Sequence, residues 1–310
     1  MRNSNTEEPA DFIIPVNMNK LQGRILRYIK PKQPKKEILL VYGHHTSIER
    51  CWELVRAFGR YGAVTVPDFP GYGGMENLYK IYENPSIDNL ADYLAAVFKL
   101  RYKQRRVIIV AIGFGFAITT RMLQKYPDIA KKIDLCVGIN AFSHKDDIII
   151  SKSRLYWYKF ATSLLRFRTT SALFRLIWVR SILPGKDNET ILRSIHNFSF
   201  RGDSFFEPSN VDYKLWVSND MRTHAQTIKT MLSIDNCQDN VNLPVWNISF
   251  GDQTFLNENY VEQHLKVIFS GYHKLTTKFD LSLPFGSPNS HIGKIIPPSL
   301  RKKILELNSD

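Results

Sequence analysis

Apolar residues alternate along the chain between short unbroken runs and longer stretches with helical spacing. The run from Val107 to Ile112 is entirely apolar, which is typical of a strand buried on both faces of a parallel sheet. From Ile87 to Leu100 the apolar residues recur three and four positions apart, and Ser86 precedes them as a candidate N-cap, so this stretch predicts a helix. Because strand and helix patterns follow one another, the chain predicts an α/β fold with a doubly wound, mostly parallel sheet.

Further elements extend this series in both directions. Near the N-terminus two runs with strand character, Gln22 to Tyr28 and Glu37 to Tyr42, flank the breaker-rich stretch Lys30 to Lys36, and we expect them to form a hairpin. The remaining pattern predicts helices over 47–61, 116–125 and from Ser299 onward, and strands over 63–66, 135–139, 244–250 and 274–281.

The strand pattern is interrupted once. From about His144 to Asp239 the chain predicts helices without strands and is rich in aromatic residues and arginine. An insertion of this kind predicts a cap placed between two halves of one sheet. We therefore expect an N-terminal tail over residues 1–21, a core formed by 22–143 and 241–310, and a helical cap over 144–240.

The most hydrophobic stretch of the chain lies in this predicted cap, from Leu155 to Leu183. Basic residues interrupt it too often for a membrane span. Lys152, Lys159 and Arg166 recur at seven-residue spacing and so share one helical face. Two interpretations stay open, namely a cap helix with its arginines in water and a basic amphipathic helix that contacts a membrane.

Composition and charge narrow the class of protein. The 310 residues are 44% hydrophobic and 23% charged, as expected for a folded globular protein with room for one large domain and an insertion. The net charge of +13 attracts anionic partners. Because the lysines and arginines are scattered, we expect a solvated basic surface and no nucleic-acid partner, while an anionic membrane surface stays open as a partner.

Cysteine usage and the N-terminus predict a compartment. The three cysteines, Cys51, Cys136 and Cys237, form no CxxC pair, which is typical of a reducing environment. The first ten residues are polar and acidic and lack the basic-then-apolar order of a signal peptide. We therefore expect a cytoplasmic protein.

Three stretches in the first half of the chain have the character of motifs. Leu39 to His45 is a predicted strand that runs into a turn at Gly43, and Val66 to Gly73 is a glycine-rich turn in which Asp68 can accept backbone N–H bonds. Ala111 to Gly115 reads Ala-Ile-Gly-Phe-Gly and joins a predicted strand to a predicted helix through small residues.

Two further stretches follow strands in the second half. Leu243 to Thr254 is a strand that ends in Gly-Asp-Gln-Thr, and Pro288 to Gly293 carries His291 ahead of the terminal helix. Taken in order, the five stretches resemble the α/β-hydrolase family, and the resemblance covers about residues 22 to 308 apart from the cap. It implies the α/β-hydrolase fold with an inserted helical cap.

The resemblance also assigns the positions of a catalytic triad. Gly113 falls on the serine of the Gly-x-Ser-x-Gly nucleophile elbow, and Thr254 falls on the acid, with Asp252 two residues earlier as a candidate substitute. His291 falls on the histidine and would be the general base of an active enzyme. Glycine offers no nucleophile and a neutral threonine cannot hold an imidazolium by charge, so we do not expect an intact Ser-His-Asp triad.

The same resemblance implies a ligand pocket near Gly43, His44, His45 and Phe114. His44 and His45 would lie over the elbow, where they either line the pocket or hydrogen-bond the loop. No three of the histidines and acidic residues show a metal-ligand spacing such as HExxH, so we expect neither a metal nor a cofactor.

Three functions stay open. The first is a non-catalytic pseudo-hydrolase that binds a small apolar or acyl ligand or a partner protein. The second is an active hydrolase or lyase-type enzyme that uses His291 as a general base without a covalent intermediate. The third is a peripheral membrane or scaffold role through the basic cap.

Overall fold

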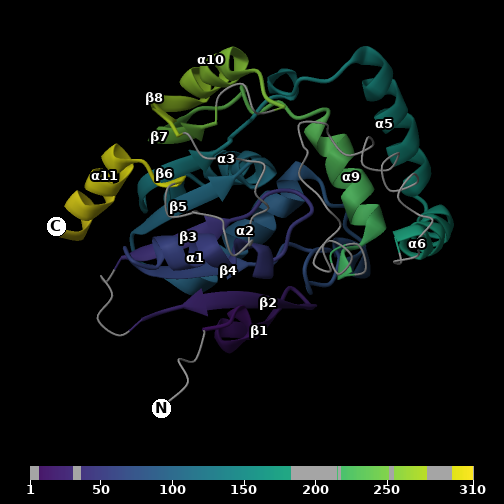
Figure 1. The fold of residues 1–310 in the computed structure, drawn as a ribbon, viewed down its shortest axis with the longest axis horizontal. Coiled ribbons are helices and arrows are strands. Elements are labelled where there is room, and N and C mark those ends of the chain that lie inside the picture. The colour runs from purple at the N-terminus through teal and green to yellow at the C-terminus, as the bar shows by residue number, and fades with distance from the viewer. Residues whose placement is uncertain are drawn as a thin grey trace.

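A single mixed sheet forms the centre of the molecule (Figure 1). The computed structural model describes residues 7–30, 36–182, 215, 218–250, 255–277 and 295–309. Within these residues eight strands lie in the order β1-β2-β4-β3-β5-β6-β7-β8. Pairing is antiparallel from β1 to β2 and from β2 to β4 and parallel everywhere else, which confirms the predicted mostly parallel sheet. The strands are β1 Ile13–Met18, β2 Leu21–Tyr28, β3 Glu37–Val41, β4 Ala63–Pro67, β5 Val107–Ile112, β6 Ile133–Ile139, β7 Val241–Ser249 and β8 Phe269–Thr276.

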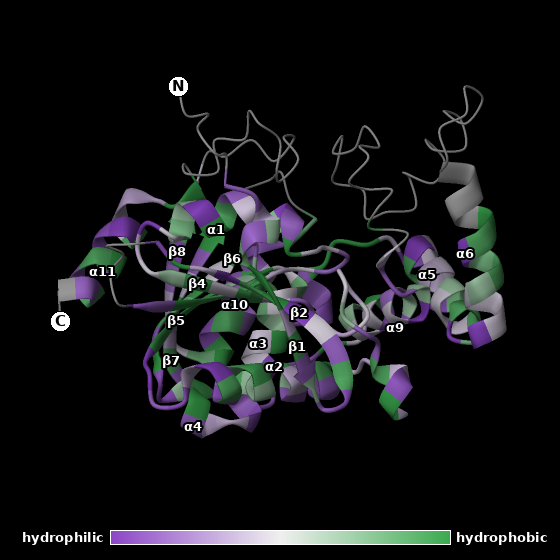
Figure 2. Ribbon diagram, turned by 90° about the horizontal axis from the view of Figure 1, so that it is seen from below, coloured by the Kyte–Doolittle hydropathy of each residue, from purple (hydrophilic) through white to green (hydrophobic). Residues whose placement is uncertain are grey.

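Helices cover both faces of the sheet. Figure 2 shows α1 (Trp52–Phe58) and α11 (Pro298–Ser309) on one face, and α2 (Ile87–Tyr102), α3 (Phe114–Lys125) and α4 (Pro127–Ala130) on the other. At the β8 end of the sheet, α10 (Glu258–Ile268) leads directly into the last strand. Short 3₁₀ helices lie at η1 Pro9–Phe12, η2 Glu49–Cys51, η3 Leu78–Ile81 and η4 Lys145–Asp147. Because helices shield both faces, the central strands β3 and β5 are apolar at nearly every position and almost completely buried.

The predicted N-cap of α2 is confirmed. Ser86 has an extended backbone, and its side chain accepts the N–H of Asn89 at 3.2 Å. The helix starts at Ile87 as expected and buries one face against the core.

The expected hairpin between the runs at 22–28 and 37–42 is wrong. Strand β2 pairs instead with β1 and β4, and β3 lies between β4 and β5. The hairpin that does form joins β1 to β2 through Asn19 and Lys20, which both have positive φ (51° and 68°), as a two-residue type I′ turn requires. Strand β1 therefore lies within residues 1–21, which we had expected to be a tail.

The last strand begins earlier than its apolar pattern indicates. We expected a strand over 274–281, whereas β8 spans Phe269–Thr276 and pairs with β7 from Val241↔Phe269 to Ser249↔Thr276. The strand follows directly on α10, and Gly271 together with polar residues on its half-exposed surface weakens the apolar signal in its first half.

Three described α-helices lie between β6 and β7, to one side of the sheet in Figure 1: α5 (Lys152–Leu165), α6 (Arg168–Ile182) and α9 (Met221–Met231). They lie in the region predicted as a helical cap, and the limits of that cap as a domain stay a prediction. None of the helices described is both long and apolar enough to span a bilayer.

Candidate ligand site at the turn after strand β5

A sharp turn joins β5 to α3, and Gly113 lies at its centre. Gly113 has φ 49° and ψ −117°, and its N–H donates to the carbonyl oxygen of Ile139 at 3.0 Å. A Cβ built on Gly113 would meet no atom of the described residues within 4 Å beyond its chain neighbours. The turn thus points the side-chain position of residue 113 into open space, as an elbow that presents a nucleophile does, but it carries no side chain there.

The neighbouring glycine explains why the turn needs small residues. A Cβ on Gly115 would overlap the carbonyl oxygen of Tyr42 and lie 2.9 Å from that of Val41. Helix α3 therefore begins directly against the end of β3, and only glycine permits this approach.

The hydroxyls closest in sequence to Gly113 serve the helix. Thr119 and Thr120 are fully buried in α3 and donate to the carbonyl oxygens of Gly115 and Phe116 at 2.8 and 3.0 Å. Bonds to the preceding helical turn keep these side chains in the helix, so they do not replace the missing nucleophile.

The loop after β3 runs beside the turn. A Cβ on Gly43 would lie 3.3 Å from the carbonyl oxygen of Ile112, and the ring of His44 lies edge-on to that of Phe114, with centroids 6.2 Å apart. His45 follows with a positive φ of 50°. The structure thus brings together all four residues that the sequence placed in the pocket.

A third histidine, which sequence reasoning missed, completes this cluster. His224 comes from α9, and its ring centroid lies 4.6 Å from those of both His44, in a stacked arrangement, and His45, edge-on. A chain separation of about 180 residues left no local signal for this contact. We call His44, His45 and His224 the histidine cluster.

Hydrogen bonds link His44 to helix α9. The single hydroxyl proton of Thr227 is donated along α9 to the carbonyl oxygen of Thr223 at 2.8 Å. The Thr227 oxygen also lies 2.5 Å from the Tyr72 hydroxyl and 2.9 Å from Nε2 of His44. This shared hydroxyl ties the loop after β3 and the turn at Tyr72 to α9.

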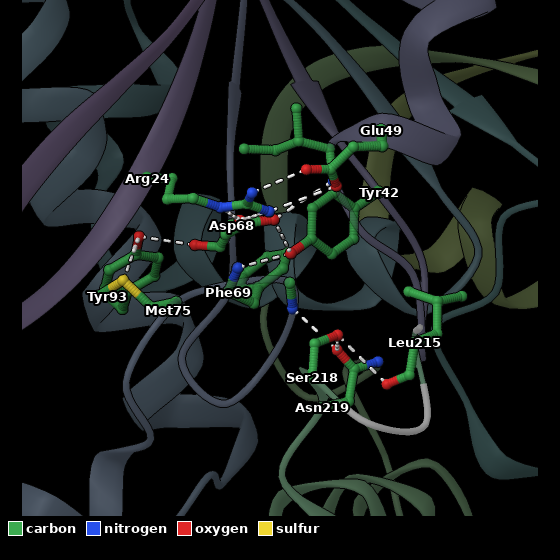
Figure 3. Close-up of polar contacts among 12 residues, drawn as sticks. Arg24, Tyr42, Glu49, Asp68, Phe69, Met75, Tyr93, Leu215, Ser218 and Asn219 are labelled. Atoms are coloured by element: carbon green, nitrogen blue, oxygen red, sulfur yellow. Dashed lines mark hydrogen bonds and ion pairs between the residues drawn. The ribbon is translucent and has the colours of Figure 1, made fainter. Parts of the chain in front are cut away.

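A side-chain amide sets the tautomer of His45. Asn219 accepts the N–H of Gly73 through Oδ1 at 2.9 Å, so its Nδ2 is the atom that faces Nδ1 of His45 at 3.2 Å (Figure 3 shows Asn219). An amide nitrogen can only donate, hence Nδ1 of His45 accepts and Nε2 carries the proton. The two histidines after β3 are thus held by residues from the segment that precedes and forms α9.

Burial keeps the histidine cluster neutral. It lowers the pKa of His44 from 6.5 to about 4, although an interaction with the backbone of His224 opposes the shift. Burial also lowers the pKa of His45 and of His224, and the neighbouring rings add to this effect because a second positive charge would be repelled. At pH 7 the cluster therefore presents neutral imidazoles.

The glycine-rich turn after β4 lies beneath the histidine cluster and is held by Asp68. Its buried carboxylate accepts from Arg24 at 2.8 Å, from the Tyr42 hydroxyl at 2.9 Å and from the N–H of Ile48 at 3.3 Å (Figure 3). Burial raises the pKa of Asp68 to about 6, opposed by Arg24 and Tyr42, so the group is ionised at pH 7. A Cβ on Gly73 would overlap this carboxylate, and Gly73 has φ 66°, so this position requires glycine.

Helix α9 packs directly on the turn after β4. Asp220 caps the helix by accepting the N–H of Thr223 at 2.7 Å, and its own N–H donates to the carbonyl oxygen of Gly71 at 2.8 Å. A Cβ on Gly71, which has φ 85°, would overlap Thr223. This close packing sets the position of His224 and Thr227 over the loop after β3.

The other predicted site residues fall outside the described part of the chain. Thr254, Asp252 and His291 belong to residues 251–254 and 278–294, so their proposed roles stay predictions. Across the ranges that the structure does describe, no group of three or more histidine, cysteine or acidic side chains is placed to hold a metal ion.

A small cleft lies next to the turn, at the carboxyl ends of β6, β7 and β8. It has a volume of about 10 Å³, enough for one water molecule. It begins at Asn140, immediately after the residue that accepts the Gly113 N–H, and its polar lining includes Asn247, Ser249, Glu258 and Lys274. Lys274 pairs with Glu258 at 2.9 Å, so the cleft carries a neutralised ion pair.

A buried aspartate outside the predicted site joins two elements. Oδ1 of Asp147, in η4, lies 2.5 Å from Nδ1 of His264 in α10, and Oδ2 accepts the N–H groups of Ser143 and His144 at 2.9 Å each. Because its oxygens bond α10 and the loop after β6, Asp147 has a structural role.

Comparisons with known proteins agree on the fold. Neither a family model nor a curated protein matches the sequence. Among solved structures, a putative epoxide hydrolase from Klebsiella pneumoniae has a TM-score of 0.63 and 12% identity, and covers 97% of this chain and 99% of its own.

Two further structural neighbours are enzymes named for other reactions. The haloalkane dehalogenase DatA from Agrobacterium tumefaciens has a TM-score of 0.62, 14% identity and coverage of 94% and 96% of the two chains. An enol-lactonase from Burkholderia xenovorans has a TM-score of 0.58, 14% identity and coverage of 86% and 91%. This protein thus has the α/β-hydrolase fold, and at such low identities the likeness concerns the fold alone.

Proposed function

We propose that this α/β-hydrolase-fold protein is a pseudo-hydrolase, which binds a small apolar or acyl ligand over the turn after β5 and does not form a covalent intermediate with it. The observation that carries the proposal is Gly113. The turn keeps its tight contacts around Gly115 and its positive φ at residue 113, yet the position that would present a nucleophile has no side chain.

The surroundings of Gly113 support an apolar or acyl ligand. Phe114 supplies an aromatic ring, and His44 next to it is neutral at pH 7. The N–H of Phe114 lies at the start of α3, where backbone donors have no acceptor within the helix and suit a carbonyl or carboxylate oxygen. A mostly apolar lining with a few polar groups is typical of small-molecule sites.

The first test asks whether the protein reacts through a serine nucleophile and a covalent intermediate. Purified protein is incubated with a fluorophosphonate probe and, separately, with a short-chain aryl ester. We expect neither labelling nor turnover, because no nucleophile stands at residue 113. Labelling of any serine would overturn the proposal.

The second test locates the ligand. Gly113→Ala and Gly113→Leu place a Cβ in the same strained backbone, but only leucine fills the space beyond it. Titration with lauric acid should show binding to the wild type, similar binding to Gly113→Ala, and at least tenfold weaker binding to Gly113→Leu. Equal affinities of the two variants would place the ligand elsewhere.

We also propose a second candidate, an enzyme that uses a histidine as general base on a bound substrate without a covalent intermediate. Its candidate base is His291, the position that the family resemblance assigns, because burial makes the rings of the histidine cluster neutral but also weakly basic. Ester turnover without probe labelling would indicate this candidate. His291→Ala should then lower kcat/KM by about 10²-fold or more, as expected for loss of a general base, and unchanged turnover would exclude His291 as that base.

A further inference from the structure

Helices α5 and α6 expose many large apolar side chains, while the described residues that they bury are Tyr158 and the small polar Thr162 and Ser171. In α5, Phe160 is 62% exposed while Thr162 is 5% exposed, and in α6, Leu176 is 63% exposed while Ser171 is 5% exposed. Both helices pack against α9, and most of their large apolar residues remain exposed. Figure 2 shows hydrophobic residues along the exposed length of α6.

These apolar residues form continuous stripes. Tyr156, Phe160 and Leu164 follow one another at four-residue spacing and therefore share one face of α5, and Leu173 and Leu176 are three residues apart on α6. Phe167 lies between the helices and is also exposed. We call these six residues the outer apolar face. Eight of the sixteen large apolar side chains that are exposed in the described residues fall between 156 and 177, so the exposure is concentrated here.

The charge of the same segment has one sign. Between residues 152 and 177 all six charged residues are basic, and all six are exposed: Lys152, Arg154, Lys159, Arg166, Arg168 and Arg175. The same stretch contains no aspartate or glutamate. The outer apolar face is thus surrounded by positive charge that this segment does not neutralise.

From this combination we infer that the outer apolar face docks on the surface of an anionic lipid bilayer, with its aromatic and leucine side chains in the boundary between headgroups and acyl chains. Aromatic and leucine residues beside lysine and arginine are the composition of helices that lie in a membrane interface. Long basic side chains keep their charges at the phosphate level while their stems lie on apolar surface.

Charge also argues against the other occupants of such a face. Two copies of this chain that met through it would bring two sets of six like charges together. Anionic lipids, by contrast, attract each lysine or arginine near their surface. Docking on a membrane is independent of the ligand proposed over Gly113.

The test is sedimentation of the full-length protein with vesicles of phosphatidylcholine alone or with 30% phosphatidylserine. We expect binding to the phosphatidylserine vesicles that weakens as salt is raised, and much weaker binding to pure phosphatidylcholine. Absence of binding to either vesicle, or equal binding to both, would overturn the proposal.

Two triple variants, each with a matched control, identify the surface that binds the vesicles. Phe160→Gln, Leu164→Gln and Leu176→Gln together should lower affinity for the anionic vesicles at least tenfold, because partly buried apolar area is lost. The control changes three equally exposed apolar residues elsewhere, Leu100→Gln, Val267→Gln and Leu305→Gln, and should leave affinity unchanged.

The charge variants follow the same design. Lys159→Gln, Arg166→Gln and Arg168→Gln together should lower affinity about a hundredfold, since each cation near an anionic surface contributes about fivefold. The control, Lys20→Gln, Lys131→Gln and Lys302→Gln, has the same net charge but should bind nearly as the wild type. If either control lowered binding as much as its partner, the inference would fail.

Self-association is checked on the same proteins by analytical ultracentrifugation, and folding by circular dichroism. All substituted side chains are exposed, so melting temperatures should stay within a few degrees of the wild type. If the wild type is a dimer and the variant at Phe160, Leu164 and Leu176 is a monomer, the outer apolar face binds a second copy of the chain. That result would overturn the proposal.

Discussion

Alanine substituted for two glycines of the turn after β5 tests its geometry, because local and tertiary effects predict opposite results. Gly115 lies within α3, where alanine is favoured over glycine by about 1 kcal/mol. Gly113 has φ 49°, where a residue with a Cβ is disfavoured by about 1–3 kcal/mol. Local rules therefore predict that Gly115→Ala stabilises the protein and that Gly113→Ala destabilises it.

The contacts of the two positions reverse this order. At Gly115 the new Cβ would overlap the carbonyl oxygen of Tyr42, and a second oxygen, that of Val41, already lies 2.9 Å away. Both atoms are backbone of the buried core and cannot rotate aside, so the overpacking cost exceeds the usual ~1–3 kcal/mol. After the gain in helix propensity we expect Gly115→Ala to lower the unfolding free energy by at least about 2 kcal/mol.

At Gly113 the described structure leaves room. The new Cβ meets no described atom within 4 Å, so only backbone strain opposes it, and the lower entropy of the unfolded chain offsets about 0.4–1 kcal/mol of that strain. We expect a net loss of about 1 kcal/mol. Urea unfolding followed by circular dichroism gives both values from the midpoints, provided that the m-values stay equal. A Gly115→Ala variant as stable as the wild type, or less affected than Gly113→Ala, would refute the close approach of α3 to β3.

Three further predictions concern the polar contacts around the turn. Asp68→Ala should lower the unfolding free energy in urea by about 3–5 kcal/mol because the Tyr42 hydroxyl and the N–H of Ile48 lose their buried acceptor and Arg24 keeps only its pair with Glu49, and a loss under 1 kcal/mol would contradict the network. Thr227→Val should cost about 1–3 kcal/mol, since Tyr72 and His44 lose their shared hydrogen-bond partner, whereas Thr230→Val on the same helix removes only a bond to a helix carbonyl and should cost less than about 1 kcal/mol; equal melting temperatures would contradict this. The pKa of His44 is about 4 in the folded protein and 6.5 in an unfolded chain, so the unfolded chain takes up a proton first as the pH falls. The unfolding free energy should therefore decrease between pH 6.5 and 4, by up to about 3 kcal/mol and by less where solvent reaches the ring. His44→Gln should flatten this part of the pH dependence, and an unchanged slope would exclude His44 as its source.

Much of the fold could be predicted because its signals are local. The unbroken apolar run at 107–112 and the spaced apolar positions after Ser86 became β5 and α2 at nearly the predicted limits. Predictions failed where pairing partners had to be chosen. Sequence proximity favoured a hairpin between the runs at 22–28 and 37–42, whereas β3 pairs with β4 and β5 through crossover connections that no local pattern reveals.

The candidate site could be predicted only in part. Small residues around Gly113 indicated the turn, and the neighbouring glycine at 115 proved to be required by contact with β3. His224, Thr227 and Asn219 carried no comparable signal, because each acts on a residue more than 140 positions away. The alternation of polar and apolar residues on α9 resembled that of any surface helix.

By itself the sequence determined the order of strands and helices, the tight turn after β5 and the lack of a side chain at Gly113, because backbone preference and hydrophobic spacing act over a few residues. Only the tertiary structure decided which imidazoles surround that turn, since contacts from α9 and the residues before it bring them together. It also decided which face of α5 and α6 meets solvent. The sequence shows apolar and basic residues mixed along these helices, and only their packing on α9 leaves the apolar stripes outside.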